Sequence, residues 1–237
     1  MAQAFAGAYI ASMVEAADWA RETEARLLDA ALPHVRELGW TSRLVRRAAA
    51  QTGLTPAEAE LLLPQGARDL VALFSYRQDE TAMASLAEVD PAGLKIRERI
   101  ARGVQARVAA AAADETASRR LMGYLALPQN LALGARLSWE SADRIWRWAG
   151  DTSSDENHVS KRVILAGLLT STLAVRLADP SAADEHLQRG IGAVMAYERA
   201  KARFNGRFGS GDPAAAAARF LGRLRHARPA GPGATRA

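Results

Sequence analysis

The sequence lacks cysteine altogether and has few histidines, and both features narrow its possible chemistry. With no Cys among 237 residues, the chain has no disulfides, no cysteine nucleophile and no Cys-ligated zinc or iron–sulfur centre. The four histidines, His34, His158, His186 and His226, are far apart, and none follows a Glu three residues earlier. The paired Glu-x-x-His motifs of a di-iron helical bundle are therefore absent. We expect no bound metal and no cofactor.

Long apolar runs are also missing. The longest run of large uncharged apolar residues, about 163–169, is much shorter than the roughly 18 residues that span a bilayer. The N-terminus carries Glu15 and Asp18 but no basic residue before Arg21, so it does not resemble a signal peptide. These features favour a protein of the bacterial or organellar cytosol without a membrane-spanning segment.

Common enzyme motifs are absent as well. There is no G-x-x-x-x-G-K-[ST] phosphate loop and no G-x-S-x-G nucleophile elbow. The nearest approach to a dinucleotide fingerprint, Gly190-Ile-Gly192, lacks the third glycine and lies inside a helical pattern, which favours a role in helix packing. With no candidate catalytic residue, the sequence predicts a binding protein that is not an enzyme.

What the sequence does contain is helical periodicity in an Ala- and Leu-rich chain, which predicts an all-α fold. The first helix is predicted over 23–38, the next is capped by Thr41 or Ser42 and ends near Gly53, and a third has Pro56 in its first position with a Thr55/Glu58 capping box. Further helices are predicted over 67–80, from Asp90-Pro91 to about 108, and over 116–126, 129–149, 157–178, 182–204 and 213–225.

The net charge of +5 comes from the C-terminal end of the chain. From Arg199 onward there are nine basic residues and one acid, Asp212, whereas residues 1–198 are mildly acidic. A basic tail on an acidic body predicts contact with an anionic surface, either membrane lipid or nucleic acid; a solvated, disordered tail is the alternative.

The first three predicted helices resemble the start of a TetR-type regulator. The resemblance rests on Leu28-Asp-Ala-Ala-Leu, Gly39-Trp40 and the stretch 43–55, in which Thr52-Gly53-Leu54 lies where a helix-turn-helix bends. In such regulators the following helix enters the major groove of DNA.

The helix that would enter the groove, 56–64, has two Glu and no Lys, Arg or Asn. A phosphate backbone would repel it, so DNA is not an expected partner. Arg43, Arg46 and Arg47 keep a DNA-binding transcriptional regulator open as the alternative function.

Ordered cues over residues 24–203 extend the resemblance to one family. They are Leu28-Asp-Ala-Ala-Leu with Gly39-Trp40, Pro64-Gln-Gly-Ala-Arg-Asp-Leu-Val71, Leu94-Lys-Ile-Arg-Glu-Arg-Ile100, Leu125-Ala-Leu-Pro-Gln-Asn130, Ile145-Trp146 with Ala149-Gly150-Asp151, and Ser154-Asp155-x-Asn157 with Lys161-Arg162. Each cue is short, but all occur in order along most of the chain. Together they resemble the lipid-binding accessory family of ubiquinone biosynthesis that is named for the ninth coenzyme Q gene.

That resemblance implies a TetR-like helical bundle that does no catalysis, binds isoprenoid or other lipid, and assists the hydroxylase acting on demethoxyubiquinone. We therefore expect a non-catalytic accessory protein that presents isoprenoid quinone precursors to a ring hydroxylase at the membrane. Its expected ligand is an isoprenoid quinone intermediate or a phospholipid, its expected assembly is a homodimer, and its expected location is the bacterial cytoplasm, peripheral to the inner membrane.

Helices with wide Leu/Ile faces can enclose an apolar pocket, although the same residues could be plain core. The candidate lipid-lining residues are Ile96, Ile100, Leu121, Leu125, Leu133, Leu137, Trp146, Leu165 and Leu169. Pro128 is expected to kink or break its helix, which would either widen such a pocket or merely end the helix.

The resemblance also implies a surface for the hydroxylase. The family's usual Asp-Phe-Asn-Trp-Tyr is here Asp-Glu-Asn-His-Val at 155–159, so the aromatic pair that would anchor the partner is lost. The candidate partner-binding residues are Asp155, Asn157, His158, Val159, Lys161 and Arg162, of which the first two could instead be helix caps. We expect this protein to bind the family's usual hydroxylase weakly or not at all, and to assist a different ring hydroxylase.

A C-terminal amphipathic helix that meets the membrane is a further feature of the family. Here Asp212 would cap it and Pro213 would begin it. The candidate membrane-binding residues are Arg219, Phe220, Leu221, Arg223, Leu224 and Arg225.

The predicted organisation is thus an N-terminal extension (1–22), a helix-turn-helix-like region (23–80), a lipid-binding bundle (81–205), a linker with the amphipathic basic helix (206–227) and a disordered tail (228–237).

Overall fold

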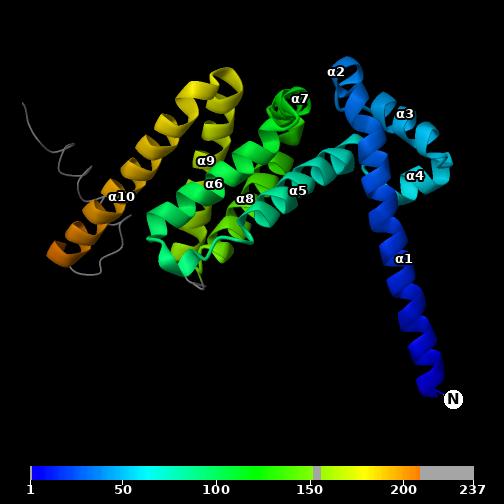
Figure 1. Cartoon of the computed structure of the whole chain (residues 1–237), viewed down its shortest axis with the longest axis horizontal. Helices are drawn as coiled ribbons and strands as arrows, with labels where there is room; N and C mark the ends of the chain where they lie inside the picture. The colour runs from blue at the N-terminus through cyan, green and yellow to red at the C-terminus, as the bar shows by residue number, and fades with distance from the viewer. Residues whose placement is uncertain (1, 152–155, 209–237) are drawn as a thin grey trace, which may run out of the picture. The chain divides into compact units, whose positions relative to one another are not determined.

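The computed structural model describes the backbone over residues 2–151 and 156–208, and side chains over 14–151, 158–194 and at 196. The chain divides into two compact units, Met1–Ile191 and Gly192–Ala237, which are described separately. The α-helices are α1 (Ala2–Ala31), α2 (Val35–Leu38), α3 (Ser42–Thr52), α4 (Pro56–Leu62), α5 (Ala67–Leu86), α6 (Ile96–Ala112), α7 (Glu115–Leu125), α8 (Leu131–Trp148), α9 (Glu156–Ala178) and α10 (Ala183–Phe208) (Figure 1).

The prediction of an all-α fold is confirmed: over the described backbone, every regular element is an α-helix or a short 3-10 helix. The first unit holds α1 to α9 and the beginning of α10, and the helical part of the second unit runs from Gly192 to Phe208. The predicted C-terminal amphipathic helix (213–225) lies outside the described residues, and the TetR-like arrangement stays a prediction.

The N-terminal region differs from its prediction at both ends of the first helix. The proposed extension 1–22 is not separate, because α1 runs without a break from Ala2 to Ala31. The predicted helix 23–38 is interrupted at Pro33, where a 3-10 turn, Leu32–His34, leads into the short α2. Proline lacks the backbone donor that a continuing α-helix needs, which explains the interruption. Gly39, at a φ of 61°, then ends α2.

In the region predicted to form a helix-turn-helix, a short turn joins α3 to α4. Thr41 caps α3 by accepting from the Leu44 amide, and α3 ends at Gly53, whose φ of 72° lies in the left-handed region that favours glycine. The predicted capping box is also confirmed, since Thr55 and Glu58 each accept a hydrogen bond from the other's backbone amide at the start of α4.

Two later boundaries were also misplaced. The helix predicted over 67–80 extends to Leu86, and the helix expected to begin at Asp90-Pro91 is there only a 3-10 turn, Pro91–Gly93. Asp90 caps that turn, but Leu94 is extended, so α6 begins afresh at Ile96. At Pro128 the predicted break is confirmed, because a 3-10 turn separates α7 from α8.

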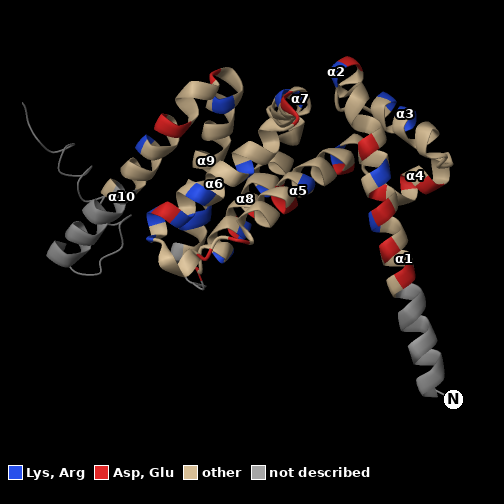
Figure 2. Cartoon of the chain, in the orientation of Figure 1, with Lys and Arg blue, Asp and Glu red and all other residues tan. Residues whose placement is uncertain are grey.

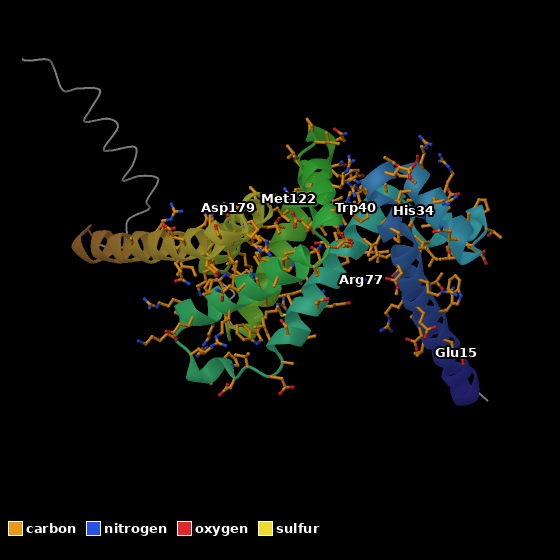
Figure 3. All side chains as sticks on the ribbon, turned by 45° about the horizontal axis from the view of Figure 1, so that its top comes forward. Glu15, His34, Trp40, Arg77, Met122 and Asp179 are labelled. Carbon is orange, nitrogen blue, oxygen red and sulfur yellow. The ribbon has the colours of Figure 1, made fainter. Side chains whose placement is uncertain are left out.

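Trp40 joins the N-terminal helices to the bundle. Its side chain is 3% exposed, its ring centroid lies 5.2 Å from that of Phe74 in α5, and its Nε1 donates to the Ala117 carbonyl in α7 (3.3 Å). Figure 3 shows Trp40 between the N-terminal helices and the α7 region. The surrounding core is aliphatic, built mainly from Leu, Val and Ala of α1, α3, α5, α7 and α8.

Close helix packing depends on glycine at one point of the bundle. A Cβ added at Gly103 in α6 would overlap the side chain of Ile145 in α8. The missing side chain therefore lets the backbone of α6 approach α8 closely.

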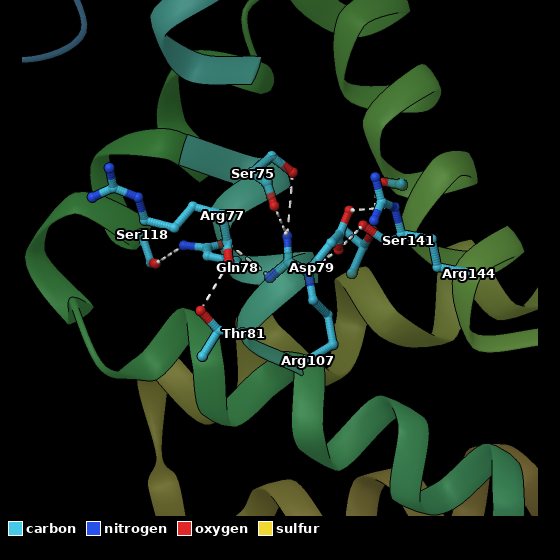
Figure 4. Close-up of polar contacts among 11 residues, drawn as sticks. Ser75, Arg77, Gln78, Asp79, Thr81, Arg107, Ser118, Ser141 and Arg144 are labelled. Atoms are coloured by element: carbon cyan, nitrogen blue, oxygen red, sulfur yellow. Dashed lines mark hydrogen bonds and ion pairs between the residues drawn. The ribbon is translucent and has the colours of Figure 1, made fainter. Parts of the chain in front are cut away.

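A polar cluster lies among the buried side chains of the bundle (Figure 4). Asp79 of α5 is 2% exposed, and its Oδ1 accepts from Arg107 Nε of α6 (2.5 Å) and from Ser141 Oγ of α8 (2.7 Å). Arg107, 6% exposed, also donates to Gln78 (2.7 Å) and Ser75 (3.2 Å).

The cluster reaches a fourth helix through Gln78, which donates to Ser118 of α7 (3.1 Å). Burial lowers the pKa of Arg107, and the carboxylate of Asp79 opposes that shift. The second oxygen of Asp79, Oδ2, has no hydrogen-bond partner among the described residues, and Arg144 Nε lies 3.9 Å from it. The cluster thus links α5, α6, α7 and α8 around one charge pair.

Removing one member of this pair should destabilise the protein more than removing both. We expect Asp79→Leu to cost about 3–5 kcal/mol of unfolding free energy, because Arg107 is left charged and buried without its partner. The double variant Asp79→Leu/Arg107→Met should recover much of that loss. Urea unfolding of the two single variants, the double variant and the unchanged chain gives the interaction energy.

Arg21→Ala is the matched control, since Arg21 pairs with Asp18 on the exposed surface of α1 and should contribute little. Losses that simply add in the double variant would contradict coupling between Asp79 and Arg107.

Candidate functional site

A groove of about 520 Å³ lies between α6, the end of α9 and the start of α10. Its lining residues are Gln105, Val108, Ala109, Ala112, Ala113, Thr172, Arg176, Pro180, Ala183, Asp184 and Leu187. All of them belong to the first unit of the chain. The volume falls within the range that small-molecule sites occupy.

Small side chains explain why this groove is open. Four of its lining residues are alanines, three from the end of α6 and its C-cap and one from the first turn of α10. Packed helices normally fill the space between them with larger side chains, so a run of alanines leaves room. Val108 and Leu187, both largely buried, supply the groove's apolar floor.

Polar groups border the same groove. Gln105 Nε2 of α6 donates to Asp184 Oδ1 of α10 (3.0 Å), so the two helices are joined across it. Arg176 lies in the last turn of α9 and is half-buried. Asp179 caps the connection to α10 by accepting from Ser181, and these hydrogen bonds lower the pKa of Asp179. An apolar ligand with one polar end would suit this combination.

Gly190 helps to bring α10 against α9. A Cβ at this position would overlap the side chain of Leu168 in α9. Gly190 and Gly192 both lie within α10. For Gly190, the predicted role in helix packing is confirmed by its close approach to Leu168.

None of the lipid-lining residues predicted from the sequence lines this groove. Six of them are buried in the bundle: Ile100, Leu121, Leu133, Leu137, Leu165 and Leu169. Leu125 and Trp146 are half-buried, and Ile96 is 43% exposed at the start of α6. The structure thus places six of these nine side chains in the core and none of the nine around the groove.

Sequence reasoning missed the groove because it looked for large apolar side chains. The relevant signal was the opposite, a run of alanines at 109–113 with few bulky residues around it. Helical periodicity alone cannot reveal the space that small side chains leave between helices.

The predicted partner surface lies where α8 and α9 meet. His158 is half-buried, with its ring centroid 6.3 Å from that of Trp139, and Val159 is 53% exposed. One turn further along α9, Val163 is 57% exposed. This part of the chain therefore presents aliphatic area beside a tryptophan.

Lys161 is held in place by its neighbours. Its Nζ contacts Asp151 Oδ1 (2.8 Å) and lies 5.4 Å from the centroid of the Trp146 ring. Trp146 Nε1 in turn donates to the Lys161 carbonyl (3.1 Å). These contacts fix the start of α9 against the end of α8.

Arg162 is not available for direct contact with a partner, contrary to its prediction. Its side chain is 1% exposed, its Nε contacts Asp143 Oδ1 (2.6 Å), and its Nη1 contacts Asp151 Oδ2 (3.2 Å). Burial raises the pKa of Asp143, but the hydrogen bond from Arg162 and the nearby charge of Arg147 outweigh it and hold that pKa below its ordinary value. Arg162 therefore joins α9 to α8 and to the turn between them.

Several residues predicted to bind a partner or the membrane lie outside the described part of the chain. Asp155 and the side chain of Asn157 lie outside the described residues, as do the membrane-contact candidates Arg219, Phe220, Leu221, Arg223, Leu224 and Arg225. Among the described residues, no helix is both long and apolar enough to cross a membrane, and no cluster of three or more His, Asp or Glu side chains could hold a metal ion.

Comparison with known proteins finds similarity to the COQ9 proteins. The COQ9 family model matches residues 131–198, which include α8, α9 and the beginning of α10. The chain is 27% identical over 165 residues to the ubiquinone biosynthesis protein COQ9, mitochondrial, of Rattus norvegicus, covering 66% of this chain and 52% of that protein.

Two other relatives give the same picture. The probable ubiquinone biosynthesis protein coq9 of Dictyostelium discoideum is 26% identical over 166 residues, covering 68% of this chain and 54% of its own length. Human COQ9 is 28% identical over 166 residues, covering 66% and 51%. The chain spans about half the length of these curated relatives.

One expectation is overturned by these comparisons. The sequence had suggested the bacterial cytoplasm, with contact to the inner membrane, but the relatives are named as mitochondrial proteins. The absence of a recognisable signal peptide was therefore a poor guide to location. The family resemblance, in contrast, is confirmed: this chain is similar to the COQ9 proteins of ubiquinone biosynthesis, and its residues 131–198 match the COQ9 family model.

Proposed function

We propose that this chain is a non-catalytic accessory protein of ubiquinone biosynthesis, which binds an isoprenoid quinone precursor and presents it to a ring hydroxylase at a membrane. The observation that carries the proposal is the relationship to proteins named for ubiquinone biosynthesis. The chain's own structure supports a binding role through the groove between α6, α9 and α10.

The groove suits one end of a lipid better than a polar metabolite. Val108, Leu187 and the four alanines offer apolar surface, and burial of an isoprenoid chain there would remove that surface from water. Arg176 and Asp184 at the border could meet a polar ring or headgroup. A phospholipid would satisfy the same requirements, so it is the second ligand to test.

A transcriptional regulator is not favoured. In the helix-turn-helix shape, α4 would be the DNA-reading helix, yet it carries Glu58 and Glu60 and no basic residue. Figure 2 shows acidic residues on α4 and basic residues on α3. A reading helix with that charge would be repelled by phosphates.

Filling the groove should reduce the lipid that co-purifies with the protein. Ala109 is exposed and lines the groove, so Ala109→Phe places a ring in the groove without disturbing the core. We expect the lipid-to-protein ratio, measured by native mass spectrometry and lipid extraction, to fall several-fold.

Ala84→Phe is the matched control, because Ala84 is an exposed alanine of α5 that does not line the groove. Lipid-free protein, or a lipid load that Ala109→Phe leaves unchanged, would count against this groove as the binding site.

The partner surface generates a second prediction. His158 and Val159 stand where the family's usual sequence has an aromatic pair, and aromatic anchors contribute strongly to protein interfaces. We expect the double substitution His158→Trp/Val159→Tyr to strengthen binding to the family's usual hydroxylase, the one acting on demethoxyubiquinone, at least tenfold in Kd, because each ring adds apolar contact area. Calorimetry with the purified hydroxylase measures the change.

Ala174→Tyr controls for a general effect of aromatic area, since Ala174 is exposed on the same helix, several turns away. Tight binding by the unchanged protein, or equal gains from both variants, would be inconsistent with a partner surface at the start of α9.

A further inference from the structure

A second, more polar hollow lies on the other side of the molecule's first unit, beside the helix-turn-helix shape. It has a volume of about 390 Å³ and is lined by His34, Glu37, Leu38, Arg43 and Arg47. The first three come from the turn after α1 and from α2, and the two arginines come from α3. Figure 3 shows His34 where the end of α1 meets α3.

The arginines of α3 are exposed and unpaired within the described part of the chain. Arg43, Arg46 and Arg47 make no ion pair and no side-chain hydrogen bond with any residue that the structure describes. Arg43 and Arg47 are four residues apart, so their side chains are neighbours on one face of α3. Two guanidinium groups therefore face the same hollow without a counter-charge of their own.

More positive charge lies close by. Arg36 is an exposed residue of α2, and Arg120 of α7 donates to the Arg36 carbonyl (2.9 Å), which brings its guanidinium to the same end of the bundle. The first turn of α3 has no acidic residue. Figure 2 shows this concentration of Arg on α3.

One carboxylate opposes this charge. Glu37 lines the hollow, is exposed, and forms no ion pair with either arginine. His34 is engaged differently, because its Nε2 is hydrogen-bonded to the side chain of Gln51 at the end of α3 (3.0 Å). Within the hollow the formal charge still favours an anion, with two arginines against one glutamate.

We propose that this hollow binds a single phosphate group, held by the guanidinium groups of Arg43 and Arg47. Arginine presents a planar fork of N–H donors that matches the oxygens of phosphate, and it stays charged at all physiological pH values. The phosphate is either free in solution or part of a lipid headgroup, since both sources offer the same oxygens to the arginines.

The hollow's place in the fold argues against extended nucleic acid as its ligand. The helix that follows α3 carries Glu58 and Glu60, so a DNA backbone running from α3 onto α4 would meet negative charge. A single phosphate group needs only the α3 side of the turn, where the carboxylate of Glu37 is its one acidic neighbour among the lining residues.

Calorimetry and vesicle co-sedimentation with the full chain test the proposal. The probes are inorganic phosphate, vesicles that contain phosphatidic acid, and neutral phosphatidylcholine vesicles as the blank. We expect Arg43→Ala and Arg47→Ala each to weaken binding of the responsive probe about tenfold, since a hydrogen bond to a charged group is lost. Arg47→Lys should lose less, because it keeps the charge but not the fork.

Two further variants sharpen the result. Glu37→Gln removes the opposing carboxylate and should tighten binding several-fold, an effect that a merely unfolded variant cannot imitate. Arg102→Ala, at an exposed arginine of α6 away from the hollow, should change nothing. Because the tail from Arg199 onward is also basic, vesicle binding is judged by the difference between these variants.

A response to phosphate alone would identify a soluble ligand, and a response to phosphatidic acid alone a lipid headgroup; either supports the proposal. It is overturned if neither probe binds, or if Arg43→Ala and Arg47→Ala behave like Arg102→Ala. Binding of a short DNA duplex that only the α3 variants abolish, without binding of either phosphate probe, would overturn it in favour of a nucleic-acid surface.

Discussion

The buried ion pair between Asp79 and Arg107 is the constraint around which the bundle is arranged. A charge inside an apolar core must have a partner, so α5 and α6 can pack only where these two side chains meet. Ser141 extends the requirement to α8, and the link from Gln78 to Ser118 extends it to α7. Aliphatic contacts would tolerate small sliding of one helix along another, whereas this cluster fixes their register.

The proposed groove is built on that fixed frame. Val108 follows Arg107 directly in α6, so the residue that anchors the helix inside the bundle also sets where its neighbour lines the groove. At the other end of the bundle, Arg162 holds α9 against α8 by pairing with Asp143 and Asp151. Buried charges thus help to position the groove and the partner surface at the start of α9.

Much of the fold could be predicted because helical periodicity and capping are local signals. The Thr55/Glu58 capping box, the turn at Gly53 and the break at Pro128 all lie where the sequence placed them. The errors arose where local signals compete: Pro33 interrupts an otherwise continuous pattern, and Asp90-Pro91 looks like a helix start but closes only a 3-10 turn.

The sites were harder to predict because they depend on what packs against what. Leu133 and Leu165 have the apolar side chains expected of a lipid pocket, yet neighbouring helices bury both in the core. Arg162 was predicted to lie on the surface, but it is buried and paired with two carboxylates from other segments. Such pairings join residues across helices, and no pattern within a single helix specifies them.

Gly103 shows how far the control of a binding surface can lie from the surface itself. Its bare backbone lets α6 settle against Ile145, one turn before Arg107 and on the opposite side of the helix from the groove. A methyl group there would overlap the side chain of Ile145, so that side chain or the backbone of α6 would have to shift. A shift of α6 would carry the alanines of the groove wall with it. The packing of α6 against α8 therefore influences the width of the groove. Ligand selectivity in this fold can thus change through residues that contact no ligand.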